Sequence, residues 1–386
     1  MTNEPYSYLG TPSVVPVELA PDVEGPRDRI LELPEDQEKR AMCLHHEAIV
    51  FDLHNHVHRL ARNMERDFEL YARSGRVAIG FGGIARSGLT ACFNGYGGSA
   101  GRRSSPQAWQ FDDVLWDIGT RQADIYHHPE TATIGTCVAD IHRAKKEGRC
   151  AIFVNIENAG IIGNELDRID VLYGLGARCL GLSYNQRSTI ADGTNERVDG
   201  GLSVFGEKVV ERMNRLGILI DLAHSSDQTI LDTLQVSSKP CCVSHALPQA
   251  LSSHPKAKSD EMLKKIAQAG WVLGVQAVPN VTSDKPYQSI FDVADQIEHC
   301  VSVMGVDHVA VGTDAMFGDH RGLHRCISRM MAHPEKELVG EYIEYLENPG
   351  EMPNMARVLV SRGFSDEDIA KILGLNVVRL LEKTIG

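Results

Sequence analysis

The feature that most constrains the fold is a regular alternation of short apolar runs with amphipathic stretches. Eight runs rich in β-branched and aromatic or aliphatic residues occur at 48–54, 87–93, 151–157, 178–184, 217–224, 240–245, 271–276 and 308–314. Helical patterns lie between them, for example at 204–217, 259–270 and 290–305, and each ends on a glycine where a helix C-cap is expected. Strands that alternate with helices indicate a parallel sheet covered by helices.

Eight such units predict an α/β fold of the (β/α)₈ TIM barrel type, with a doubly wound open sheet as the alternative. We expect the barrel domain to span residues 45–386. Residues 1–44 are rich in Pro, Glu and Asp without periodicity, which predicts an extended N-terminal arm. The tail at 363–386 is amphipathic, with acidic residues at 366–368 near a helix start, and predicts C-terminal helices packed on the barrel.

The charge balance restricts the class of partner. The chain of 386 residues has 39 Lys and Arg against 52 Asp and Glu, a formal net charge of -13. This excess of acidic groups argues against nucleic acid or an anionic membrane as partner and favours a small-molecule substrate. The N-terminus has no basic and apolar leader, and no apolar run approaches the roughly 20 residues of a membrane-spanning helix. We therefore expect a cytoplasmic protein.

Metal-binding side chains follow the predicted strands. The first strand runs into His54 and His56, the third ends at Glu157, and later ones end at His224 and His245. The carboxyl ends of barrel strands converge on one face, so these side chains are expected to meet there. A buried imidazole or carboxylate without a partner is costly, which makes the coincidence hard to explain by core packing alone.

The spacing also predicts roles for these residues. His54 and His56 alternate along a strand and share a face, so both can bind one metal ion. Glu157 can bridge two ions through its two oxygens, with His224 and His245 on the second ion. An acidic residue, Asp314, ends the eighth predicted strand, where it could act as general base or proton shuttle.

Two further features have open interpretations. His58 continues the alternation of His54 and His56 and is a third ligand, a substrate contact or a residue of the rim. The Gly-rich stretch 95–105 lacks a phosphate-loop ending and predicts a flexible active-site loop, with phosphate binding as the alternative.

The order of motifs resembles the membrane (renal) dipeptidase family of the amidohydrolase superfamily. The resemblance covers roughly residues 45–385 and is carried by FDLHNH, NIEN, GLSVFGEKVVERMNRLGILIDLAHSS, CCVSHA, VGTDAMFG and DEDIAKILGLNVVRLLE. It implies a TIM barrel that binds two zinc ions, with Glu157 bridging, His54, His224 and His245 as ligands, and Asp314 as catalytic residue. Manganese, cobalt and iron suit the same ligands. Relatives often assemble, so the resemblance also implies a homo-oligomer.

Three positions depart from the family pattern. His56 stands where the family has an aspartate ligand, which raises the charge of the cluster by one unit. Tyr184 replaces the histidine that polarises the scissile carbonyl, and Lys256 replaces the arginine that binds the substrate carboxylate. Arg187 and Asp192 lie on the same loop as Tyr184 and are candidate substrate contacts.

These observations predict a metal-dependent hydrolase that cleaves an amide-type C–N bond in a small molecule. A metal-bound hydroxide attacks the carbonyl, Tyr184 helps to stabilise the oxyanion, and Asp314 relays the proton to the departing nitrogen. Ester or lactone hydrolysis, or a metal-assisted decarboxylation, is the alternative at the same site. A non-catalytic barrel that binds metal is the third hypothesis, and the presence of Asp314 argues against it.

Overall fold

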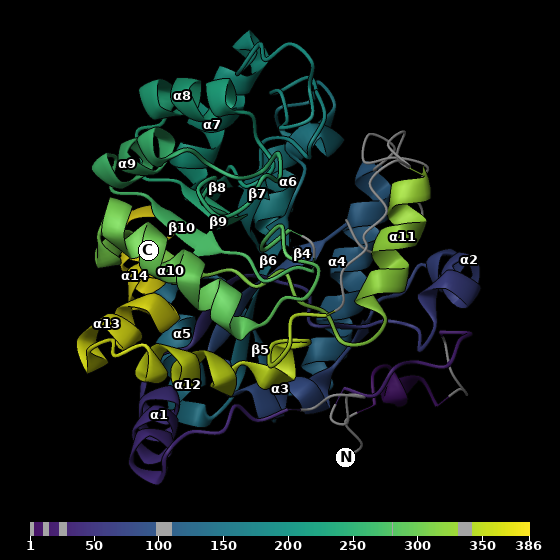
Figure 1. The fold of residues 1–386 in the computed structure, drawn as a ribbon. Helices are drawn as coiled ribbons and strands as arrows, with labels where there is room; N and C mark the ends of the chain where they lie inside the picture. The colour runs from purple at the N-terminus through teal and green to yellow at the C-terminus, as the bar shows by residue number, and fades with distance from the viewer. Residues whose placement is uncertain (1–3, 11–14, 23–28, 98–109, 280, 331–341) are drawn as a thin grey trace.

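Eight parallel strands form a barrel in the computed structural model, which describes residues 4–10, 15–22, 29–97, 110–279, 281–330 and 342–386 (Figure 1). In spatial order the strands are β1 (Phe51–Asn55), β4 (Ala91–Tyr96), β6 (Cys150–Ile156), β7 (Ala177–Gly181), β8 (Leu219–Asp221), β9 (Cys242–Ala246), β10 (Val272–Val275) and β11 (Val309–Val311). All eight predicted strands are confirmed. Their order follows the sequence without reversal, so the TIM barrel is confirmed and the doubly wound sheet is excluded.

The barrel is nearly closed by the segment that follows β11. The backbone N–H of Asp314 donates to the carbonyl of His54 at 2.8 Å, and that of His56 donates to the carbonyl of Ala315 at 3.0 Å. These bonds join the C-terminal end of β1 to the residues after the last strand. They therefore fix the two chain segments that hold three of the predicted site residues.

Away from its C-terminal mouth, the interior of the barrel is a packed apolar layer. One cluster of buried residues takes a member from every barrel strand, including Phe51, Phe93 and Phe153. The centroids of these three rings lie 5.5 to 5.9 Å apart in tilted or edge-to-face arrangements, which are favourable for aromatic pairs. The layer fills the barrel, so polar side chains that do chemistry are confined to the carboxyl ends of the strands, at the mouth of the barrel.

Helices surround the barrel (Figure 1). Their bounds are α1 (Glu35–Glu47), α2 (Met64–Ser74), α3 (Phe81–Ser87), α4 (Phe111–Tyr126), α5 (Val138–Glu147), α6 (Arg168–Gly174), α7 (Val204–Leu216), α8 (Asp227–Val236), α9 (Asp260–Gln268), α10 (Ile290–Met304), α11 (His320–Met330), α12 (Pro353–Ser361), α13 (Asp366–Ala370) and α14 (Asn376–Thr384). The three helices predicted at 204–217, 259–270 and 290–305 are confirmed as α7, α9 and α10. Each begins after a serine, Ser203, Ser259 or Ser289, whose side chain accepts a backbone N–H of the first turn.

Several elements differ from the sequence expectation. A short antiparallel pair, β2 (His58–Arg59) and β3 (Ala78–Ile79), and β5 (Ala132–Gly135), which pairs with β6 outside the ring, were not predicted. The second barrel strand begins at residue 91 rather than 87, because α3 extends to Ser87 and Gly88 then adopts a left-handed φ of 66°. The expected arm boundary after residue 44 falls inside α1, so residues 35–44 are helical rather than extended.

The C-terminal helices pack beneath the barrel, as the amphipathic tail predicts. One turn of π-helix at Lys371–Leu375 joins α13 to α14. Within it the backbone of Gly374 approaches the start of β1, where a Cβ atom would lie 2.2 Å from the carbonyl oxygen of Ile49. A glycine is therefore required for the tail to close against the first strand.

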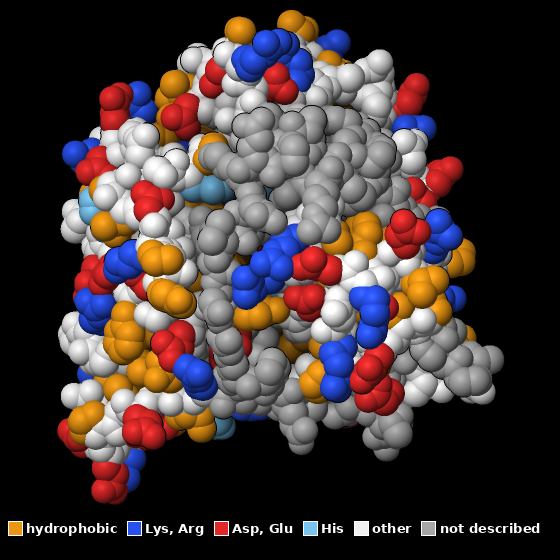
Figure 2. Space-filling model, turned by 45° about the vertical axis from the view of Figure 1, so that its right-hand side comes forward, with side chains coloured by type: hydrophobic (Ala, Val, Ile, Leu, Met, Phe, Trp, Pro, Cys, Tyr) orange, Lys and Arg blue, Asp and Glu red, His pale blue; other side chains and the backbone are white. Residues whose placement is uncertain are grey.

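The surface carries both signs of charge. Figure 2 shows Lys and Arg side chains interspersed with Asp and Glu over the face in view. Across the described residues, no helix is long and apolar enough to cross a bilayer.

Acid should weaken the packing of α1 through His45. This side chain is buried, its Nε2 lies 3.0 Å from the carbonyl of Ser87, and burial lowers its pKa to about 4. The unfolded chain takes up a proton near the ordinary histidine pKa of about 6.5, so this contribution to stability is lost as the pH falls from there towards 4. Lowering the pH from about 7 to about 5 should reduce the free energy of unfolding of the wild type by about 2 kcal/mol more than that of His45→Gln.

Urea unfolding at the two pH values measures this difference. Leu44→Met, on the same helix and without a titratable group, serves as the control and should keep the wild-type dependence on pH. Equal losses in the wild type and in His45→Gln would contradict the prediction.

Candidate metal centre

The structure brings six of the predicted site residues together at the C-terminal mouth of the barrel. His54 belongs to β1 and His56 follows it, while Glu157 comes directly after β6. His224 follows β8 and His245 lies in β9. The sixth, Asp314, follows β11. The polar cluster thus occupies the face where TIM-barrel enzymes carry their active sites.

Glu157 lies at the centre of this cluster. Its Oε1 is 3.6 Å from Nε2 of His56, and its Oε2 is 3.6 Å from Nε2 of His224 and 3.9 Å from Nε2 of His54. The two carboxylate oxygens therefore face different histidines. This is the arrangement that a bridging carboxylate needs between two metal ions.

The histidines converge in pairs on either side of Glu157. The Nε2 atoms of His54 and His56 are 3.2 Å apart, and those of His224 and His245 are 3.0 Å apart. Three groups of side chains place their ligand atoms within 4.8 Å of one another: His54, His56 and Glu157; Glu157, His224 and His245; His54, Asp221 and His245. The first two groups share Glu157, so the cluster can hold two ions through a common ligand.

Neighbouring polar groups orient two of the imidazoles. The Nδ1–H of His224 donates to Oδ1 of Asn185 at 2.8 Å. The Nδ1–H of His245 faces Oγ of Ser244 at 2.8 Å, and the Ser244 hydroxyl donates in turn to Asp221 at 2.5 Å. A histidine that donates from Nδ1 keeps the Nε2 lone pair for a metal, so both contacts select the metal-binding tautomer.

The side-chain amide of Asn155 has the corresponding place next to His54. It lies 3.0 Å from His54 Nδ1, while the other end of the amide, Oδ1, is buried without a partner among the described residues. Turning the amide by half a rotation brings Oδ1 onto the Nδ1–H of His54 and satisfies the oxygen. The orphaned oxygen thus fits a His54 that presents Nε2 to a metal ion.

Burial keeps the imidazoles of His54, His224 and His245 neutral. Removal from water lowers the pKa of His54 to about 3 and holds the pKa values of His224 and His245 well below the ordinary value. A neutral imidazole has a lone pair available for coordination, whereas a protonated one does not.

Asp314 approaches the cluster from the segment that follows β11. Its Oδ1 lies 3.2 Å from Nε2 of His56, and its Oδ2 accepts a hydrogen bond from the side-chain amide of Gln276 at 2.8 Å. Burial raises the pKa of Asp314, but the hydrogen bond from His56 and the neighbouring imidazoles outweigh burial and hold it well below the usual range. The backbone of Asp314 has a φ of 58°, a conformation that few residues other than glycine adopt.

A glycine makes room for the cluster. A Cβ atom at Gly95, in β4, would lie 2.3 Å from Cε1 of His56 and 2.9 Å from Oε1 of Glu157. Any larger residue there would displace two of the predicted metal ligands.

Tyr184 and Lys256 border the centre. The Tyr184 ring stacks on the imidazole of His224, with centroids 4.1 Å apart and planes 27° apart. Lys256 is buried, and burial lowers its pKa to about 8 against the opposing charges of Asp314 and Glu157. A lysine in this position supplies a positive charge close to the cluster.

The other predicted contacts have protein partners of their own. His58 lies in β2, where its Nε2 is 2.5 Å from a guanidinium nitrogen of the buried Arg121 of α4. Arg187 and Asp192 form a two-point ion pair of 2.5 and 2.7 Å with each other, which braces their loop. Their contact with a substrate stays a prediction. The expected flexible loop at 95–105 lies mostly outside the described residues, which stop at 97 and resume at 110.

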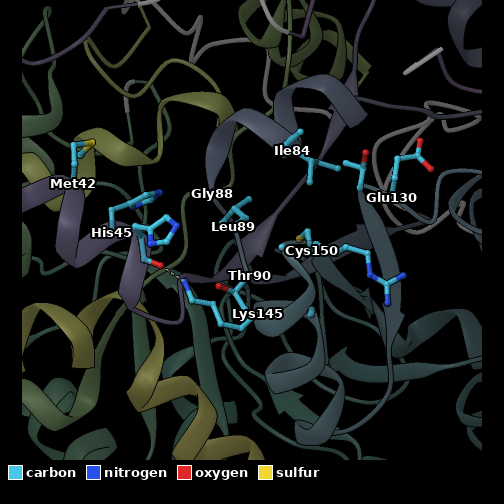
Figure 3. Close-up of a pocket in the computed structure, with 15 residues that line it drawn as sticks. Met42, His45, Ile84, Gly88, Leu89, Thr90, Glu130, Lys145 and Cys150 are labelled. Carbon is cyan, nitrogen blue, oxygen red and sulfur yellow. Dashed lines mark hydrogen bonds between the residues drawn. The ribbon is translucent and has the colours of Figure 1, made fainter. Parts of the chain in front are cut away.

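A cavity of about 500 Å³ lies away from this cluster, at the N-terminal side of the strands (Figure 3). Its lining includes His45 of α1, Thr90 before β4, Lys145 of α5 and Cys150 at the start of β6. The Lys145 amine donates to the backbone carbonyl of His46 at 2.6 Å, the contact marked in Figure 3. The lining contains none of the predicted site residues.

Sequence reasoning missed the residues that orient the candidate ligands. They are Asn155, Asn185, Asp221, Ser244 and Gln276, together with Gly95. For Asn155 a signal was present, because it lies two residues before Glu157 on the same strand face. Asn185 lies in the loop after β7 and Gln276 directly follows β10. Each is distant in sequence from its partner, His224 or Asp314, and no local pattern relates the two members of either pair.

The donor set defines the class of protein. Four imidazole nitrogens and two carboxylates at the mouth of a TIM barrel suit zinc, manganese, cobalt or iron, and a shared carboxylate suits two adjacent ions. Such centres activate water for hydrolysis, so fold and site together indicate a metal-dependent hydrolase.

Comparison with known proteins gives the family. The model of the membrane dipeptidase family, peptidase family M19, matches residues 38–324. The chain therefore belongs to this family, and it is a metallohydrolase. The resemblance seen in the sequence motifs is confirmed.

Individual relatives agree with this assignment. The chain is 27% identical to dipeptidase aclJ of Aspergillus oryzae over 336 residues, which cover 85% of this chain and 73% of the relative. It is also 27% identical to dipeptidase tcpJ of Claviceps purpurea over 247 residues, covering 63% of this chain but only about half, 53%, of the relative. A solved amidohydrolase from Pseudomonas aeruginosa superposes with a TM-score of 0.75 at 28% identity, covering 90% of this chain and 99% of the other.

Gly95→Ala should damage metal binding without unfolding the protein. The new methyl group would push the His56 ring and the Glu157 carboxylate from their positions, so we expect metal affinity to fall by roughly 10- to 100-fold. Gly119→Ala is the matched control, because a Cβ atom there meets no other atom within 4 Å. Competition with a chromophoric chelator measures the affinity, and circular dichroism checks the fold. Unchanged affinity in Gly95→Ala would contradict the geometry of the centre.

Proposed function

We propose that this protein is a dinuclear zinc hydrolase that cleaves an amide-type C–N bond in a small molecule bearing a carboxylate. The observation that carries the proposal is the position of Glu157, whose two oxygens each lie 3.6 Å from the Nε2 of a different histidine. His54 and His56 would hold one ion, His224 and His245 the other, and Glu157 both. When bound, the ions supply the Lewis acidity that makes water nucleophilic at neutral pH and polarises a carbonyl oxygen.

Asp314 is the residue that moves the proton. Its low pKa keeps the carboxylate ionised, so it can accept a proton from the attacking water and deliver it to the leaving nitrogen. The amide of Gln276 donates to Oδ2, which leaves Oδ1 directed at the histidine cluster. The left-handed backbone of Asp314 is part of this positioning, because it turns the side chain back over the mouth of the barrel.

Tyr184 and Lys256 determine how the substrate lies. The stacking of Tyr184 on His224 fixes the ring next to the cluster, where its hydroxyl would donate a hydrogen bond to the developing oxyanion. Lys256 places a buried ammonium group near the same centre and would pair with the substrate carboxylate. A lysine offers no bidentate fork, so it accepts carboxylates in more than one orientation.

Relatives support the same reaction class. Two curated relatives are named dipeptidases, and the structure of a metallopeptidase from Rhodobacter sphaeroides holds a phosphinate mimic of the dipeptide L-Ala-D-Ala. Because Tyr184 and Lys256 replace the family's histidine and arginine, we place N-acyl amino acids beside dipeptides as the substrate class.

Asp314→Asn should abolish turnover and leave metal content unchanged. Loss of the proton-transfer group is expected to lower kcat by at least about 100-fold, because general acid–base catalysis contributes factors of this size. The measurement is hydrolysis of a panel of dipeptides, N-acyl amino acids and esters, together with metal analysis of both proteins. Turnover of esters alone by the wild type would favour the ester or lactone alternative. Full metal content in the wild type without turnover on the whole panel would favour a binding protein.

Lys256→Met should weaken binding of carboxylate substrates specifically. Loss of a buried charge-assisted contact is expected to raise KM roughly 10- to 100-fold for N-acyl amino acids, with little change for the same compounds capped as amides. Lys256→Arg restores the charge and should recover most of the affinity. Lys264→Met, at an exposed position of α9, is the control. An equal effect on capped and uncapped substrates would exclude carboxylate recognition by Lys256.

A further inference from the structure

A third close pair of histidines lies outside the cluster described above. His320 and His324 occupy the first two turns of α11, four residues apart, so both side chains lie on the same face of the helix. Their Nε2 atoms are 2.7 Å apart, and their rings meet edge to face with centroids 4.4 Å apart and planes 67° apart. His320 is buried and His324 is half-buried.

This geometry repeats that of the candidate metal centre. There, the Nε2 atoms of His224 and His245 are 3.0 Å apart with ring planes at 67°, and those of His54 and His56 are 3.2 Å apart with planes at 83°. In each pair the coordinating nitrogens, rather than the carbon edges, point at each other. Two histidines at positions i and i+4 of a helix are also the spacing by which known zinc enzymes bind a metal ion from one helix face.

Contacts with α2 hold the start of α11 in place. Asp319, directly before the helix, accepts the backbone N–H of Gly322 at 2.9 Å and that of Met64 at 2.8 Å. One turn further on, Arg325 pairs with Glu65 of α2 at 2.6 Å. Figure 1 shows the two helices side by side at the edge of the barrel. The backbone that carries the histidine pair is therefore held in place before any ligand binds, which lowers the cost of binding.

The pair also lies beside the candidate centre. His320 is six residues from Asp314 in the segment that follows β11. Burial lowers the pKa of both imidazoles, and the charges of Asp314 and His56 act on both of them. Both side chains are therefore neutral near pH 7 and have lone pairs available.

We propose that His320 and His324 bind a further divalent transition-metal ion at the mouth of the barrel, separate from the two at the cluster around Glu157. Imidazole ligands favour zinc, copper and nickel over magnesium or calcium. Among the described residues no third histidine, cysteine or carboxylate joins the pair, so water would complete the coordination. The site therefore binds more weakly than the cluster and exchanges its ion with the medium.

Equilibrium dialysis of the full chain against increasing free Zn²⁺, with metal analysis of the protein, tests the proposal. We expect the wild type to take up one equivalent more than His324→Ala at saturation, or His324→Ala to bind that equivalent at least about tenfold more weakly. His320→Asn is the second variant and should behave like His324→Ala. His299→Ala, a histidine of α10 paired with Asp260, is the control and should match the wild type.

The outcomes separate this site from the main cluster. Glu157→Gln is expected to lose tightly bound zinc and to retain the weaker equivalent, whereas His324→Ala is expected to do the reverse. Circular dichroism establishes that each variant is folded. Superimposable isotherms for the wild type, His324→Ala and His320→Asn would overturn the proposal and leave the pair as a hydrogen bond between two neutral imidazoles. Loss of the weaker equivalent in Glu157→Gln as well would show that it belongs to the main cluster.

Discussion

The buried carboxylate of Asp52 joins the first barrel strand to the segment that follows the last one, and the geometry of the site depends on this contact. Its Oδ1 accepts the backbone N–H groups of Thr313 and His54 at 2.9 and 3.2 Å, and its Oδ2 accepts the Thr313 hydroxyl at 2.5 Å. Burial raises the pKa of Asp52 to about 6, with these hydrogen bonds opposing the shift. The contacts hold β1 against the segment after β11, which places His54 beside Asp314. Removing the carboxylate would leave several buried donors unpaired, at about 1–3 kcal/mol each.

Around the contact between β1 and the segment after β11, folding rather than ligand binding orders the candidate metal-binding groups. Asn185 and the Ser244 hydroxyl set the tautomers of His224 and His245, and the absence of a side chain at Gly95 leaves space for His56. Groups fixed by packing and hydrogen bonds lose little freedom when an ion or substrate arrives. The three departures from the family pattern, His56, Tyr184 and Lys256, change the charge and shape of the site. The contacts that support the site are already in place before an ion or substrate binds.

The sequence predicted the barrel and the clustering of the candidate ligands at its mouth because both follow from local periodicity. Strand ends converge in a parallel barrel, so His224 and His245 could be brought together without knowing any loop. The partners that orient them could not be predicted in the same way, since the Asn185 contact depends on a loop that adopts a φ of 59°. The helix over residues 35–44 was missed because its tertiary contacts stabilise it more than its pattern does. The ion pair of Arg187 with Asp192 likewise becomes visible only when the loop is folded.

The most direct test of this account is the metal content of the protein purified without chelator or added metal, measured by mass spectrometry for the wild type and for Glu157→Gln. A bridging Glu157 predicts about two equivalents of zinc per chain in the wild type and fewer than one in the variant, because both ions lose a shared ligand. Equal metal content in the two proteins, or no bound metal in the wild type, would contradict the claim that this cluster is a dinuclear centre.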